Sequence, residues 1–249
     1  MKRVEKYIEV FNAIVLNNID APNNVVKIGE NKIPISYSGI VAERNVYILK
    51  EIFRLLGEKN YFVAAFLFGD LIENVKLLLY FLRGFGDEEK IPESLEKFDE
   101  WYKNRPEKKI ADNFRSDTDW KFNAKEIIDK NKILADFKNE TTKINVMNKD
   151  CDKVIHKNGY CNFRPMLVGE KVVSEEKVLF VAKFFFTLIV LFDGLSLRSS
   201  DYEKYLEVGE TPPDGSEMWI APIFQKFIDD EYSAEEKKKL QKLCYMRIE

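Results

Sequence analysis

The chain contains one histidine, His156, and only three cysteines, which excludes several common kinds of site. A single histidine cannot complete the usual zinc-ligand spacings, and no CxxC pair is present. An odd number of cysteines argues against a disulfide framework, and the N-terminal segment lacks a signal-peptide pattern. The sequence therefore predicts reduced thiols in a soluble, cytoplasmic protein.

The glycine and serine motifs of several enzyme classes are also missing. Neither GxGxxG nor a P-loop occurs, so the sequence gives no support for nucleotide binding of those types. GxSxG is absent as well, which argues against a serine hydrolase built on a strand-turn-helix elbow. We therefore expect no cofactor.

The chain has neither an excess of positive charge nor a long apolar run. Its formal net charge is −3, from 39 basic and 42 acidic residues, so the overall basic character of many nucleic-acid-binding proteins is missing. A local basic face is still compatible with that total. The most apolar segment, 178–192, is shorter than the roughly 20 residues that span a bilayer. It predicts a buried core helix and no contact with a membrane.

Apolar residues are abundant and recur at helical spacing. The composition is 45% hydrophobic and includes 19 phenylalanines, enough for a thick aromatic core. Helical periodicity marks four long segments: 41–56, 61–83, 122–156 and 174–194. Four helices of this length joined by loops predict an all-α protein with an antiparallel four-helix bundle core.

The sequence predicts a single domain over residues 1–249. The bundle core spans 41–194, with an N-terminal extension over 1–40 and a C-terminal extension over 195–249 that carries extra helices. Within the first extension, two runs rich in β-branched residues flank a Gly-Glu-Asn turn. They predict a short β-hairpin near residues 24–37.

Local signals predict where several helices begin and end. Ser174 is expected to cap the N-terminus of the segment 174–194, and Ser233 to open a further helix with a capping box. Gly57 is expected to end the helix 41–56. Residues 195–215 are rich in turn formers and are interpreted as a connector.

Two acidic residues, Asp70 and Glu73, stand in the apolar segment 61–83. Spaced at i and i+3, they share one face of a helix. Burying an unpaired carboxylate costs several kcal/mol, so we expect a partner such as Arg44, Arg54 or Lys76. The main interpretation is a buried polar network that fixes helix register. A carboxylate metal site is an alternative.

The segment that ends at His156 is locally basic. Residues 121–157 contain nine lysines against six acidic residues. Such a balance usually marks a solvated helix face, but this is also the stretch best suited to an RNA phosphate backbone. His156 stands at the predicted end of the helix, where it either caps the last carbonyls or belongs to a site.

The sequence C-D-K-V-I-H-K-N-G, residues 151–159, resembles the end of the third bundle helix in HEPN-type and abortive-infection-like helical proteins. The segment FLFGDLIENVKLLLYFL resembles an earlier helix of those bundles. The resemblance covers about 41–194. It implies a prokaryotic defence protein, as in phage defence, or a toxin-type protein that acts on RNA as a metal-independent ribonuclease and forms a homodimer. The family motif is an Arg followed four to six residues later by His. Here Lys149 stands before His156 and no Arg does.

The resemblance implies a catalytic set of His156, Lys149 and Lys153. An imidazole can act as base or acid near neutral pH, and a lysine can stabilise charge on the phosphoryl oxygens. Two copies of the chain in a dimer would supply both acid and base. The residues expected to support this set are Asn148, Asp152, Asp70 and Glu73. Two alternatives stay open: a non-catalytic helical module that binds a protein partner or dimerises, and a metal site at Asp70 and Glu73.

Overall fold

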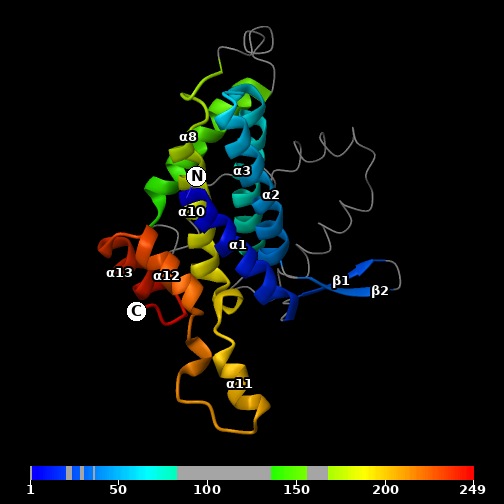
Figure 1. Ribbon diagram of the computed structural model, residues 1–249, viewed down its shortest axis with the longest axis vertical. Coiled ribbons are helices and arrows are strands. Elements are labelled where there is room, and N and C mark those ends of the chain that lie inside the picture. The colour runs from blue at the N-terminus through cyan, green and yellow to red at the C-terminus, as the bar shows by residue number, and fades with distance from the viewer. Residues whose placement is uncertain (1, 21–23, 29–30, 36, 83–135, 156–167) are drawn as a thin grey trace.

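The computed structural model describes residues 2–20, 24–28, 31–35, 37–82, 136–155 and 168–249 (Figure 1). This part of the chain is mostly helical, which confirms the all-α class. The long helices are α1 (Lys2–Asp20), α2 (Tyr37–Gly57), α3 (Tyr61–Leu82), α8 (Lys138–Ile155) and α10 (Glu175–Phe192). Shorter elements follow: a 3₁₀ helix (Gly194–Leu197), α11 (Asp201–Glu207), a 3₁₀ helix (Ser216–Met218), α12 (Pro222–Glu231) and α13 (Ala234–Leu243).

Strands β1 (Asn24–Ile28) and β2 (Asn31–Ile35) lie between α1 and α2. They pair antiparallel, and Val26 stands opposite Ile33. Proline has no N–H to donate. Pro34 is tolerated because each strand of a two-stranded sheet has only one neighbour and therefore one free edge.

The first residues of the predicted helix 122–156, up to 135, lie outside the described residues.

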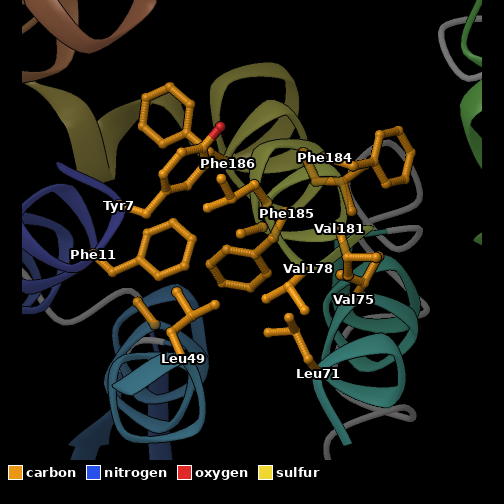
Figure 2. Packing of buried hydrophobic residues seen from close by; sticks show 14 of the residues in the cluster. Tyr7, Phe11, Leu49, Leu71, Val75, Val178, Val181, Phe184, Phe185 and Phe186 are labelled. Carbon is orange, nitrogen blue, oxygen red and sulfur yellow. The ribbon is translucent and has the colours of Figure 1, made fainter. Parts of the chain in front are cut away.

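Helix α10 is the centre of the hydrophobic core. It is apolar on nearly every side, and twelve of its 18 residues are buried, as expected for a helix surrounded by others. In Figure 2, Phe185 of α10 points toward Phe11 of α1 and Leu49 of α2, and Val178 lies beside Leu71 of α3. The ring centroids of Phe11 and Phe185 are 5.1 Å apart. The predicted buried helix at 178–192 is therefore confirmed.

The core extends beyond residues 41–194. Helix α1 packs along α2 and buries Tyr7, Phe11 and Ile14 completely. On the C-terminal side, α12 buries Phe224 and Phe227 in the same cluster. Both terminal segments thus supply part of the interior rather than only covering it.

Helices α8 and α10 run antiparallel. Phe137, just before α8, lies with its ring centroid 6.4 Å from that of Phe184, and further along α8 the Lys143 ammonium lies 4.1 Å from the centroid of Phe180. As α8 advances, its contacts move back along α10. The C-terminal end of α8 therefore lies toward the start of α10, and the chain that follows α10 leaves from the opposite end of the molecule (Figure 1).

The predicted helix starts are confirmed, and α2 ends at Gly57 as predicted, but the left-handed capping residue is a different one. Ser174 accepts a hydrogen bond from the Lys177 N–H, and Ser233 forms a capping box with Glu236. Gly57 is still helical. The left-handed residue that follows α2 is Lys59, with φ 58°.

The turn around Lys59 is a Schellman motif. The Asn60 N–H donates to the Leu55 carbonyl at 2.8 Å, and the Lys59 N–H donates to the Leu56 carbonyl at 3.0 Å. Gly57 is therefore the last helical residue and not the left-handed capping residue, a position where glycine is favoured but not obligatory.

The predicted connector at 195–215 contains helix α11. We call residues 198–219 the arm, because they leave the helical core and return to it (Figure 1). Two backbone hydrogen bonds close its neck: Ser199 N–H to Trp219 O at 2.8 Å and Ala221 N–H to Leu197 O at 2.9 Å. No residue of α11 is buried.

None of the helices in the described ranges is both long enough and apolar enough to cross a membrane.

Candidate functional site

The last two turns of α8 carry four of the predicted site residues. The core side of this helix buries Met147, Cys151 and Val154. The opposite side exposes Lys149 and Lys153, which lie one turn apart on one face of the helix. The helix ends at Ile155, and His156, the next residue, lies outside the described residues.

The two lysines differ in their partners. The Lys153 ammonium lies 2.8 Å from the Asp150 carboxylate, and this hydrogen bond raises the pKa of Lys153. Lys149 forms no ion pair within the part of the chain that the structure describes. Lys149 is thus the cation on this face that remains available to an external anion.

Asn148 and Asp152 occupy the neighbouring stripe of α8. The Asn148 side-chain amide donates to the Asp152 carboxylate at 3.4 Å, and both side chains are half-buried. This contact joins two residues that are one turn apart on α8. The structure therefore groups Lys149, Lys153, Asn148 and Asp152 on adjacent stripes.

Asp70 and Glu73 do not belong to this group, and the expectation that they are buried is wrong. Both are exposed, because α3 turns Leu71, Ile72 and Val75 toward its neighbours and presents positions 70 and 73 to solvent. The Asp70 side chain is 53% exposed, and its carboxylate lies 3.8 Å from the Arg44 guanidinium of α2.

The buried polar contact between α2 and α3 is formed by two asparagines instead. The Asn74 amide donates to the Asn45 side-chain oxygen at 2.6 Å, and both residues are buried. Arg54, one of the expected partners of Asp70, binds Glu51 and Glu58 on its own helix. A buried polar network between these helices thus exists, but with different members.

No metal cluster is found in the described ranges. Within them, no three side chains of His, Cys, Asp or Glu lie close enough together to hold an ion.

A polar cluster that was not predicted from the sequence fastens α12 and α13 to α10. The Lys183 ammonium lies 2.7 Å from Glu236 and 4.3 Å from the centroid of the Tyr232 ring. The Tyr232 hydroxyl is 2.8 Å from Thr187 Oγ1. Burial raises the pKa of Tyr232 well above its ordinary value, so this hydroxyl stays protonated. The signal was in the sequence: Lys183 and Thr187 are the two polar interruptions of the apolar run 178–192.

A second cluster joins α12 to α1. The Glu231 side chain is only 4% exposed and accepts hydrogen bonds from Arg3 at 2.8 Å and from the Tyr7 hydroxyl at 3.1 Å. Burial is the largest cause of a raised pKa for Tyr7, and the neighbouring Glu231 raises it further. These groups connect helices that are far apart in sequence, and we assign them a structural role.

No family model, no curated protein and no solved structure matches this chain.

Proposed function

We propose that this protein is a HEPN-like helical protein of a prokaryotic defence or toxin system, and that it cleaves RNA without a metal at the end of α8. One observation carries the proposal. The last two turns of α8 present Lys149 and Lys153 to solvent immediately before His156. In this proposal α2, α3, α8 and α10 are the four helices of the HEPN-like bundle, which agrees with the packing of α3 against the other three.

The proposed chemistry requires a base, an acid and a cation. His156 removes the proton of the ribose 2′-hydroxyl, and the resulting 2′-oxygen attacks the adjacent phosphorus. The bond to the 5′-oxygen breaks, and that oxygen takes up a proton from a general acid. Lys149 stabilises the negative charge on the phosphoryl oxygens, because it has no competing ion pair. Lys153 contributes less because Asp150 already neutralises it.

The test is RNA cleavage by the purified full-length chain in the presence of EDTA. The substitution His156→Ala is expected to reduce the rate by about 100-fold or more, as for loss of a general base. Lys149→Ala is expected to reduce it by roughly 10-fold to 100-fold, since a charge next to the phosphoryl group is lost. Lys153→Ala should have a smaller effect than Lys149→Ala.

Lys138→Ala is the matched control. Lys138 is an exposed lysine at the opposite end of the same helix, so its removal changes net charge without touching the proposed site. This variant should cleave at the wild-type rate. Absence of cleavage by the wild-type protein, or full activity of His156→Ala, would overturn the proposal.

A non-catalytic interaction module is the second candidate, and the arm favours it. The arm exposes Leu206 and Val208 on a well-formed short helix and the turn that follows it. A protein that shows no cleavage but self-associates would fit this candidate.

A further inference from the structure

The arm is ordered by its own hydrogen bonds. Helix α11 ends at Glu207, and two residues later Gly209, with φ 73°, has the left-handed conformation that glycine favours. The Glu210 N–H donates to the Tyr205 carbonyl at 2.9 Å and the Gly209 N–H to the Leu206 carbonyl at 3.1 Å, a second Schellman motif. Together with the closed neck, these bonds hold the arm in shape without a buried residue in α11.

The tip of the arm exposes apolar side chains. Leu206 is 53% exposed and Val208 is 70% exposed. Apolar residues usually help to order a segment because they are buried in the core. Leu206 and Val208 are exposed and do not contribute to the core. Apolar side chains held outward on a compact loop are characteristic of an interaction surface.

Acidic residues surround this apolar tip. The arm contains six acidic residues against two basic ones, Arg198 and Lys204. Both basic residues are already paired, with Glu203 and Asp201 respectively. The exposed acidic residues that have no ion pair within the described part of the chain are Glu207, Glu210 and Asp214.

The complementary surface lies on α13 and the residues after it. Lys238 and Lys242 share the exposed face of α13, and Tyr245 (58% exposed) and Arg247 follow. None of these three cations has an ion-pair partner among the described residues. Their neighbours on α13 differ: Lys237 pairs with Asp229, and Lys239 with Glu140. The α13 surface, with the Tyr245 ring beside unpaired cations, is therefore complementary to the tip of the arm, where apolar side chains lie beside unpaired carboxylates.

Within one chain the two surfaces do not meet. Figure 1 shows α11 at the far end of the arm, away from α13, and no described ion pair joins them. They are nevertheless anchored next to each other, because the Arg247 N–H donates to the Met218 carbonyl at the neck at 2.9 Å. Two copies related by a two-fold axis can therefore each place an arm on the other's α13.

We propose that the chain forms a homodimer by this reciprocal exchange. Leu206 and Val208 of one copy pack against Tyr245 of the other, and Glu207 and Glu210 face the cations of α13. A second copy is the occupant that the charges favour, because the acidic tip and its basic complement are both on this chain.

The inference goes beyond the proposed ribonuclease function and does not depend on it. The arm leaves the molecule at the C-terminal end of α10, whereas the proposed catalytic end of α8 lies toward the start of α10. The proposed contact is formed by the arm and α13, and α8 is not part of it. Failure of one proposal therefore leaves the other standing.

The test is the molar mass of the full-length chain in solution, measured by light scattering after size-exclusion chromatography. We expect the wild type to be a dimer that dissociates more readily at high salt, where charge attraction is screened. Two double variants should each be monomeric: Glu207→Lys with Glu210→Lys, and Lys238→Glu with Lys242→Glu. Like charges then face each other in both contacts, which should weaken the dimer by about 100-fold or more.

An equimolar mixture of the two double variants provides the decisive test. In the mixed pair, the reversed arm meets the reversed α13, and the native arm meets the native α13. Both contacts regain opposite charges, so the mixture should return to the dimer mass. Circular dichroism and thermal unfolding of each variant check the fold, which should be retained because all four substituted residues are exposed.

Three results would overturn the inference: a monomeric wild type, a dimer that both charge reversals leave intact, or a mixture that stays monomeric. A monomeric wild type that loses RNA binding through Lys238→Glu and Lys242→Glu would assign the α13 face to RNA instead. Leu206→Ser with Val208→Ser is a further variant that keeps the charge and removes the apolar tip. It is also expected to be monomeric.

Discussion

Two segments follow α10, and they are stabilised in opposite ways. The pair α12–α13 buries large side chains, among them Phe224, Phe227 and Tyr232. The arm forms a short helix with no buried residue. Both segments contain apolar residues, so the difference lies in where these side chains point. The first segment completes the core, and the second holds its apolar residues outward.

The polar contacts repeat this difference. The α12–α13 pair is joined to other helices through Lys183–Glu236 and Arg3–Glu231. The ion pairs of the arm, Arg198–Glu203 and Lys204–Asp201, stay within the arm itself. We therefore expect α12–α13 to unfold together with the core and the arm to open locally at lower free energy.

The largest expected effect comes from truncating the core side of this comparison. Phe227→Ala should lower the free energy of unfolding by about 3–5 kcal/mol, because it leaves a cavity between rings. The Phe227 ring centroid is 4.9 Å from that of Tyr7 and 4.8 Å from that of Phe186. Leu206→Ala, the matched truncation in the arm, should change the free energy of unfolding by less than about 0.5 kcal/mol. Denaturant unfolding of both variants measures these free energies, and equal losses would contradict the difference between the two segments.

The next effect is electrostatic and depends on pH. Partial burial would raise the pKa of Glu236, but the hydrogen bonds from Lys183 and Ser233 outweigh it, so the pKa lies below its ordinary value of 4.5. A lowered pKa in the folded state stabilises the fold above the ordinary value, and this contribution is lost as pH falls through the folded-state pKa. Glu236→Gln should cost about 1 kcal/mol at pH 7, and the difference from wild type should shrink below pH 4.5.

Glu203→Gln is the control for that measurement. It removes the partner of Arg198 in the arm, and its unfolding midpoint should equal that of the wild type at each pH between 7 and 3. A pH-independent loss in Glu236→Gln would show that the carboxylate charge is not what fastens α13.

The smallest effect compares the two Schellman turns. Lys59→Gly should raise the free energy of unfolding by about 0.5–1 kcal/mol, because glycine adopts the left-handed conformation without strain. Gly209→Ala introduces the corresponding strain into the arm. It should speed hydrogen exchange at the Glu210 amide without lowering the global unfolding midpoint. A lowered midpoint would mean that the arm unfolds with the core.

Helix positions were predictable because their signals are local. The segments 61–83 and 174–194 differ by at most two residues at either end from α3 and α10. Apolar spacing defines such helices, and a serine cap fixes the start of α10. Helix α11 was not found in this way because it is short: Tyr202, Tyr205 and Leu206 have helical spacing, but over little more than one turn.

The faces of α3 could not be predicted for a different reason. This helix is apolar nearly all round, so its pattern does not say which side meets a neighbour. Packing decided that Asn74 is buried and Asp70 exposed. On α8, the four-residue spacing of Lys149 and Lys153 puts both lysines on one face of the helix. The pairing of Lys153 with Asp150 depends on side-chain conformation, which a sequence pattern does not determine.

The contact between α1 and α12 can form only after α12 has been synthesised. The Tyr7 hydroxyl binds Glu231, 224 residues later in the chain. At usual translation rates the ribosome needs roughly 10–45 s to cover that distance. Throughout this interval Tyr7 has no native partner on α12, and the aromatic side of α1 stays available to chaperones. We therefore expect the nascent chain to be bound at its first helix until α12 has emerged.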